Sequence, residues 1–253
     1  LDIPQFPELV KYGAVRPESA ARTCRGGPDD FRGDGQKYGP FFYTSADIKE
    51  ILEYANKRFI TIVPEVEIPG HVRALLASHP EFACREGLSR VPRLMYGVEY
   101  DVLCAGNDEA IRFMEKVYDE VCKLFPGLYI HIGGDEASKQ SWKVCPQCQA
   151  RMQQENLSTV DELQSYLIHR IETYLNTHGR QLIGWDEILD GGLAPRAIVM
   201  SWRGTEGGLR AIAAGHRAIM TPGEYCYLDA YQDAPHKQPE AIGGYLPLKK
   251  VYS

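Results

Sequence analysis

Two adjacent carboxylates, Asp135 and Glu136, are the residues of this sequence best suited to acid–base chemistry. They follow the apolar run Leu128 to Gly133 and a second glycine, Gly134, and glycines there let a ligand approach the backbone closely. Neighbouring carboxylates raise one another's proton affinity, and burial raises it further. One of the pair can then stay protonated near neutral pH and act as a general acid. The alternative is a surface pair at the start of the next helix, where carboxylates are common.

Two tryptophans, Trp185 and Trp202, end two later apolar runs. If these runs are neighbouring parallel strands, both indoles point toward one pocket, where they can pack against the apolar face of a sugar ring. The alternative is that both are core residues, the commoner fate of tryptophan. The polar neighbours Asp186, Glu187 and Arg203 favour a position at the mouth of a pocket.

Short apolar runs alternate with amphipathic stretches along the chain. The runs are nearly continuous in hydrophobicity, which is typical of parallel strands covered on both faces; they span residues 59–66, 128–133, 181–186, 197–202 and 216–221. The stretches between them carry helix signals: Thr44 with Asp47, Asn107, and Ser158 with Asp161 at starts, then Thr205 at the start and Gly215 at the end of a shorter helix. Strict alternation of this kind predicts a parallel α/β fold.

Functional side chains at the end of every consecutive run distinguish a barrel from an open sheet. These groups are Glu65, Glu67 and His71; Asp135 and Glu136; Trp185 to Glu187; Ser201 to Arg203; and Tyr225, Tyr227 and Asp229. Such a pattern is typical of a (β/α)8 TIM-type barrel, and no glycine-rich phosphate loop supports a nucleotide-binding sheet. About five of the eight strands are visible. We therefore expect residues 1–253 to be a single catalytic barrel domain that lacks its first and last strands.

Composition excludes two classes of partner. The formal net charge is -6 and no block of Lys or Arg stands out, so we expect no binding to nucleic acid. No apolar run approaches the ~20 residues of a membrane span, and the segment from Leu1 to Tyr12 does not resemble a signal peptide.

The seven cysteines include one close pair, Cys145 and Cys148, in a C-x-x-C motif. A zinc site requires a second such pair or two histidines nearby, and neither follows in the sequence. We therefore predict no metal site, and we expect the motif to be a local clip in a surface loop, either as a disulfide or as free thiols.

Four segments together resemble the family-20 glycoside hydrolases, the β-N-acetylhexosaminidases. They are Val63 to His71 (VPEVEIPGH), His131 to Glu136 (HIGGDE), Gly184 to Glu187 (GWDE) and Ser201 to Gly204 (SWRG). The resemblance covers essentially the whole chain. It implies hydrolysis of terminal N-acetylhexosamines, in which the 2-acetamido oxygen of the substrate attacks the anomeric carbon and configuration is retained, an exception to the two-carboxylate scheme.

The resemblance also implies a role for each site residue. Glu136 would protonate the leaving oxygen and later activate water, while Asp135 would orient the acetamide. The substrate-binding residues would be His71, Trp185, Trp202, Tyr227 and Asp229. No cofactor is implied, the partner is a glycan or glycoconjugate, and the location is secreted, periplasmic or lysosomal. The oligomeric state is not predicted. The family's arginine from the first strand and Trp/Glu pair from the last strand have no counterpart here, in keeping with missing strands.

Three alternatives remain at this point. A metal-dependent barrel hydrolase would use His71, His131, Asp135 and Glu136 as ligands. A non-catalytic sugar-binding fragment would keep the pocket without turnover. An enzyme for plain β-glucosides would need two carboxylates about 5 Å apart on different strands, which an adjacent pair does not provide.

Overall fold

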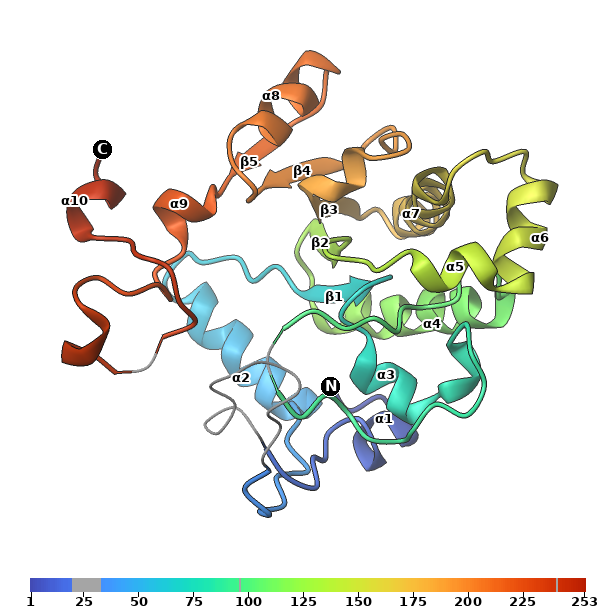
Figure 1. Cartoon of the computed structure of the whole chain (residues 1–253), viewed down its shortest axis with the longest axis horizontal. Coiled ribbons are helices and arrows are strands. Elements are labelled where there is room, and N and C mark those ends of the chain that lie inside the picture. Colours follow the sequence, from blue (N-terminus) through green and yellow to red (C-terminus); the bar gives the residue numbers. More distant parts are fainter. Residues whose placement is uncertain (20–32, 96, 240) are drawn as a thin grey trace.

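The computed structural model describes residues 1–19, 33–95, 97–239 and 241–253. Its centre is one sheet of five parallel strands whose spatial order follows the chain (Figure 1). The strands are β1 (Glu65–Ile68), β2 (Tyr129–Gly133), β3 (Gln181–Trp185), β4 (Ile198–Ser201) and β5 (Ala218–Met220). All of the predicted strands form in the described residues, so the sheet itself was predicted correctly.

The sequential strand order identifies the sheet as an arc of a barrel. The strand order never reverses, and connections between parallel strands of one sheet are right-handed as a rule. The connecting helices must then lie on the same face, as in a (β/α)8 barrel, whereas a doubly wound sheet places helices on both faces. The main helices are α2 (Ser45–Asn56), α4 (Asp108–Leu124), α7 (Val160–Thr177) and α8 (Glu206–Ala213), and α4 packs against both α2 and α7. The predicted partial TIM-type barrel is confirmed.

Strand β1 begins later than we predicted. The apolar residues before it do not pair with another strand: Phe59 is 99% exposed and has a positive φ of 58°, and it follows the end of α2. Pairing starts only where β2 lies alongside, with the His131 amide donating to the Pro64 carbonyl at 2.9 Å. Hydrophobicity alone therefore placed the strand too early.

Side-chain caps set where the long helices begin. Thr44 and Asp47 form a complete capping box at α2, and the Asn107 side chain accepts hydrogen bonds from two amides of α4, as predicted. At α7 the box is formed by Thr159 and Glu162, one residue later than the predicted pair. Both pairs have the required spacing, so the signal located the helix but not its first residue.

The core lies between the sheet and these helices. One apolar stripe of α4 is entirely buried: Ile111, Met114, Val117, Tyr118 and Val121. Tyr118 within it donates a 2.8 Å hydrogen bond to the carbonyl of Val66 in β1. Full burial of each large apolar side chain contributes about 1.5–3 kcal/mol, so this face fixes α4 firmly against the sheet.

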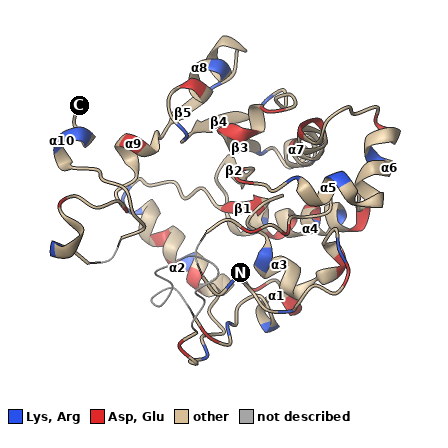
Figure 2. Cartoon of the chain, viewed as in Figure 1, with Lys and Arg blue, Asp and Glu red and all other residues tan. Residues whose placement is uncertain are grey.

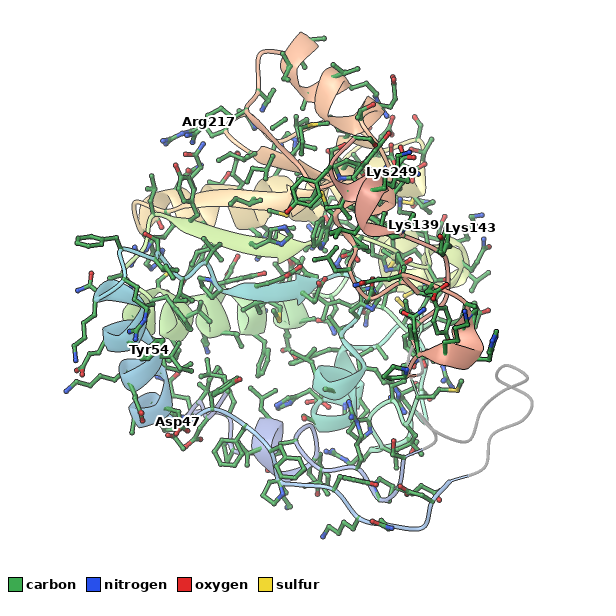
Figure 3. All side chains as sticks on the ribbon, turned by 90° about the vertical axis from the view of Figure 1, so that its left-hand side faces the viewer. Asp47, Tyr54, Lys139, Lys143, Arg217 and Lys249 are labelled. Atoms are coloured by element: carbon green, nitrogen blue, oxygen red, sulfur yellow. The ribbon has the colours of Figure 1, made fainter. Side chains whose placement is uncertain are left out.

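Shorter elements gather beyond the carboxyl ends of the strands. They are α3 (Arg73–Ser78), η2 (Pro80–Phe82), α5 (Gln140–Val144), α6 (Pro146–Gln154), η3 (Asp186–Leu189), α9 (Gly223–Cys226), η4 (Pro235–Lys237) and α10 (Leu248–Val251), while α1 (Glu8–Lys11) precedes the sheet in the chain. In Figure 3, Lys139, Lys143 and Lys249 lie on the side toward which the strands point, and Arg217 lies on the opposite side.

Charged residues of both signs are interspersed over the elements drawn in Figure 2, and Lys and Arg do not gather into one block. Among the described helices, none combines the length and the apolar character that crossing a bilayer requires.

Candidate active site

One cavity of about 730 Å³ opens at the carboxyl ends of the strands. Its lining includes every residue that the sequence predicted for the site: His71, Asp135, Glu136, Trp185, Trp202, Tyr227 and Asp229. These residues come from four strand ends and from the segment after β5. The fold therefore brings the whole predicted set together, as the barrel topology requires.

Asp135, Glu136 and His71 form a compact group in the lining of this cavity. The His71 Nε2 atom lies 3.3 Å from Asp135 Oδ2 and 3.3 Å from Glu136 Oε2. His71 and Glu136 both have positive φ angles, 52° and 46°, which side chains other than glycine rarely adopt. Such strain persists only where the surrounding structure imposes it, and it is common at functional sites.

The carboxylates change the proton affinity of His71. Its pKa is raised, first by the hydrogen bond with Asp135 and further by the charge of Glu136, although burial opposes the shift. The two carboxyl groups therefore favour the protonated form of the His71 ring.

Glu67 lies beside this group and holds a proton at neutral pH. Burial, followed by the charges of Asp135 and Glu65, raises its pKa to about 9. Among the described residues, neither Glu67 Oε2 nor Asp135 Oδ1 has a hydrogen-bond donor, and both atoms are buried. A proton on Glu67 supplies a hydrogen-bond donor between these two carboxyl groups.

Glu65 and Glu67 lie at a strand end where functional side chains were expected, but neither had a predicted role. Their i, i+2 spacing on one strand places both on the same face, which was the available signal. Glu65 accepts a 2.8 Å hydrogen bond from Trp185 Nε1, and its pKa is lowered chiefly by its hydrogen bond with His131. It therefore holds the first indole in place.

A second carboxylate holds the other indole. Trp202 Nε1 donates to Glu187 Oε2 at 3.0 Å, and the Trp202 ring stacks on Tyr227 with centroids 6.1 Å apart. Burial raises the pKa of Glu187 to about 6. Arg203 donates to the buried Asp186 at 2.6 Å. The sequence placed Asp186 and Glu187 at the mouth of the pocket, and in the structure their contacts position the aromatic wall.

The segment after β5 closes one side of the cavity. Tyr227 is half-buried there and Asp229 is exposed, whereas Tyr225 packs under the ammonium of Lys250, 5.1 Å from its ring centroid, and does not line the cavity.

The four-ligand metal site considered above does not form within the described residues. His71, Asp135 and Glu136 lie close enough to share an ion. His131 does not join them, because it is buried in β2 with Nδ1 3.2 Å from Glu65 Oε1 and 3.1 Å from the Gly133 amide nitrogen. A three-residue group in which the histidine already bridges two carboxylates is suited to proton sharing.

Cys145 and Cys148 are not in a surface loop, so that expectation was wrong. Cys145 joins α5 to α6, Cys148 lies in the first turn of α6, and both are buried. Neither forms a disulfide.

The chain is similar to known proteins of one family. The model of the family described as "Glycosyl hydrolase family 20, catalytic domain" matches residues 1–253. The chain is 49% identical to a beta-hexosaminidase of Porphyromonas gingivalis, over all of this chain and 31% of that protein. It is 35% identical to a beta-hexosaminidase of Vibrio furnissii, over all of this chain and 41% of that protein. The chain thus spans less than half the length of these relatives.

Solved structures show the same likeness in three dimensions. A crystal structure of a beta-N-acetylhexosaminidase matches with a TM-score of 0.86 at 27% identity, covering 99% of this chain and 51% of that one. The exo beta-N-acetylglucosaminidase of Vibrio harveyi, in complex with N-acetylglucosamine, matches with a TM-score of 0.80 at 29% identity, covering 99% of this chain and 39% of that one. On the family match and the shared fold, this chain belongs to glycosyl hydrolase family 20 and corresponds to its catalytic domain.

Proposed function

We propose that the protein carrying this chain is a β-N-acetylhexosaminidase that removes terminal non-reducing N-acetylhexosamine residues. The observation that carries the proposal is the contact of one histidine, His71, with two adjacent carboxylates at 3.3 Å each, within a cavity that two indoles line. Family membership and the names of the relatives support the same activity.

The proposed reaction uses the acetamido oxygen of the substrate as the nucleophile. Glu136, which lines the cavity beside His71, protonates the leaving glycosidic oxygen and then takes a proton from the water that opens the cyclic intermediate. Asp135 accepts a hydrogen bond from the acetamide N–H and stabilises the positive charge that develops there. Protonated Glu67 favours this role because it can donate a hydrogen bond to Asp135 and so hold that side chain in place.

The cavity walls suit an N-acetylated sugar. Trp185 and Trp202 present apolar surfaces to the ring and the acetamide methyl group, and the carboxylates that bind their indole N–H groups hold them in place. The Tyr227 hydroxyl is the donor to the acetamido oxygen, and Asp229 binds outer hydroxyl groups of the sugar.

The remaining parts of the proposal concern the wider protein. We propose that residues 1–253 act as one catalytic barrel domain and that the substrate is a glycan or glycoconjugate. We also propose that the protein is secreted, periplasmic or lysosomal, because members of this family meet such glycans there. Cell fractionation with an antibody against the chain tests the location.

The decisive experiment compares an aryl N-acetyl-β-glucosaminide with the matching plain β-glucoside. We expect turnover of the acetamido substrate alone, because the plain glucoside lacks the nucleophile. Glu136→Gln should lower kcat by about 10²–10⁴-fold, the usual contribution of a general acid. Glu50→Gln, an exposed change on α2, is the matched control and should leave kcat unchanged.

Two results would contradict the mechanism: turnover of both substrates, or full activity in Glu136→Gln. Binding of N-acetylglucosamine without any hydrolysis would instead favour a non-catalytic sugar-binding domain. Calorimetric titration of the same sugar into the wild-type protein distinguishes that case.

A further inference from the structure

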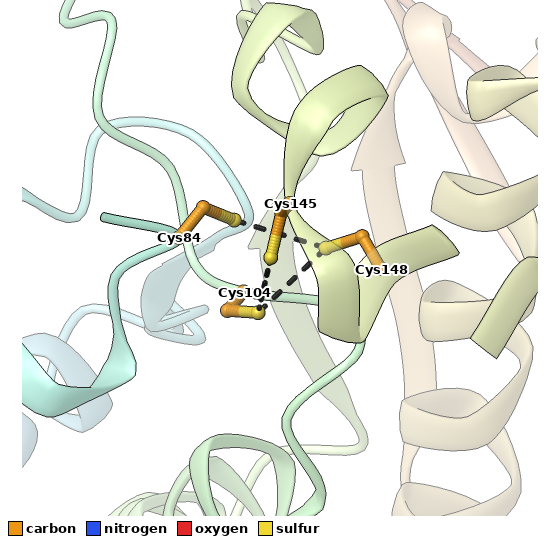
Figure 4. A group of neighbouring side chains, drawn as sticks. All are labelled: Cys84, Cys104, Cys145 and Cys148. Carbon is orange, nitrogen blue, oxygen red and sulfur yellow. Dashed lines mark hydrogen bonds between the residues drawn. The ribbon is translucent and has the colours of Figure 1, made fainter. Parts of the chain in front are cut away.

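Four cysteines from three distant segments converge beside the active-site loops (Figure 4). Cys84 follows η2, Cys104 precedes α4, and Cys145 and Cys148 flank the start of α6. Their sulfur atoms all lie within 4.8 Å of one another, and three of the four residues are fully buried. The described cysteines outside this cluster are Cys122 and Cys226.

Three of the six distances between the sulfurs are those of a tetrahedron around one ion. Cys104 Sγ lies 3.7 Å from Cys145 Sγ and 3.6 Å from Cys148 Sγ, and Cys84 Sγ lies 3.7 Å from Cys148 Sγ. Thiolates bound to zinc at about 2.3 Å in tetrahedral geometry are about 3.8 Å apart. The sulfurs of a disulfide are only about 2.05 Å apart, so these cysteines are not bonded in pairs.

The backbone around the sulfurs is arranged to hold them. The C-x-x-C motif places Cys145 at the N-cap of α6 and Cys148 in its first turn, so that both sulfurs face the same side. An isolated antiparallel bridge joins Ala83 to Leu103, next to the other two cysteines.

Gly106 completes this arrangement. Its backbone N–H hydrogen-bonds to the sulfurs of Cys104 and Cys148, as a donor to thiolates would. A Cβ atom at Gly106 would lie 2.2 Å from the carbonyl carbon of Gln147, so only glycine lets the two segments approach this closely.

We propose that Cys84, Cys104, Cys145 and Cys148 bind one zinc ion in a closed, structural site. Soft thiolate ligands in a tetrahedral set select zinc, and four cysteine ligands leave no position for water or substrate. The ion therefore stabilises the fold and takes no part in hydrolysis, so the proposal is independent of the function proposed above.

The site would connect the two loops that carry the acid–base group. One loop follows β1 and contains His71, and the other follows β2 and contains Asp135 and Glu136. Leu103, next to Cys104, donates to the Pro69 carbonyl at 3.0 Å and accepts from Trp142 Nε1 at 3.0 Å. A bound ion thus fixes Leu103 and, through it, the turn that leads into His71.

Metal analysis of protein purified without chelators tests the proposal directly. We expect close to one zinc ion per chain by mass spectrometry in the wild type. The double variant Cys145→Ser/Cys148→Ser should retain only background zinc. Cys122→Ser, a buried cysteine outside the cluster, is the matched control and should keep its zinc.

A second measurement covers the case in which the double variant fails to fold. The wild-type protein, with its zinc removed by a thiol-binding mercurial and the thiols then restored, should regain thermal stability on addition of Zn²⁺. With Co²⁺ it should show the intense visible absorption of tetrahedral cobalt thiolate. Zinc at background in the wild type, iron in its place, or an intact mass lower by four hydrogens, as two disulfides require, would overturn the proposal.

Discussion

The carboxyl groups of the cavity are held in different protonation states by their surroundings. Glu67 is neutral because burial and the nearby charges of Asp135 and Glu65 oppose its ionisation. Glu65 is ionised, since hydrogen bonds from His131 and Trp185 stabilise its charge. Two glutamates on one short strand thus serve as a hydrogen-bond donor and an acceptor. Acid–base sites commonly use surroundings that push the pKa values of two carboxyl groups apart in this way.

This difference predicts how stability depends on pH. In the unfolded chain Glu67 loses its proton near pH 4.5, but in the folded protein it keeps the proton up to a pKa of about 9. Folding therefore takes up a proton within this window, so the stability contribution present below pH 4.5 is lost as pH rises toward 9. The slope is at most about 1.4 kcal/mol per pH unit.

The substitution Glu67→Gln should abolish this slope, because an amide stays neutral at every pH and can still donate to Asp135. Urea unfolding at several pH values between 5 and 9 measures it. The variant should gain stability over the wild type as pH rises, while Glu50→Gln should follow the wild type. A constant difference between variant and wild type across this range would disprove a neutral Glu67.

Residue roles were predictable where their cause is local. Asp135 and Glu136 stand in a short motif at a strand end, so their types and spacing were enough to find them. The donor role of Glu67 depends on which charged groups lie beside it in the folded protein, and the spacing of residues in the sequence does not show this. The cysteine cluster was missed for the same reason, since Cys84 and Cys104 lie far from the C-x-x-C motif in the sequence.

At the scale of elements, the turn at the end of β2 determines how the carboxylates enter the cavity. Gly133 and Gly134 have positive φ angles of 68° and 96°, and Glu136 follows at 46°. A Cβ atom at Gly133 would lie 1.7 Å from Glu67 Oε2, so the glycine also leaves the space that Glu67 occupies.

We predict that Gly133→Ala damages both stability and activity. Alanine at positive φ costs about 1–2 kcal/mol, and the clash with Glu67 adds to this. Gly179→Ala is a matched control, because its φ of 67° is nearly the same and nothing lies within 4 Å of its Cβ position. Chemical unfolding measures stability, and kcat measures activity. Gly179→Ala should lose only the stability that the backbone conformation costs, whereas Gly133→Ala should lose more stability and also activity. Equal effects at both positions would contradict a steric role for Glu67.

Element types were easier to predict than element limits. Thr44, Asn107 and Gly215 act locally on their own helices, so these signals were correct. Strand β1 starts where a neighbouring strand offers partners, at Glu65, and the apolar residues before it gave no sign of this. Hydrogen-bond partners across a sheet are set by tertiary structure and not by the strand's own sequence.

At the scale of the molecule, the described sheet is an arc with β1 and β5 at its edges. Helix α8 covers β4 and β5 on one side only, and its other side is apolar: Leu209 and Ile212 are each 58% exposed and lie one turn apart. Figure 1 shows α8 at the upper margin of the fold, next to β5. Unpaired strand edges and exposed apolar faces both promote association between chains.

We therefore predict that the 253-residue polypeptide, expressed by itself, associates as its concentration rises. The double variant Leu209→Gln/Ile212→Gln should shift it toward the monomer, because it removes the apolar face of α8 without touching the cavity. Arg210→Gln, an exposed change on the same helix, should leave association unchanged. Size-exclusion chromatography with light scattering over a range of concentrations measures the mass. A wild-type polypeptide that is monomeric throughout that range would contradict the prediction, because the apolar face of α8 would then not promote association.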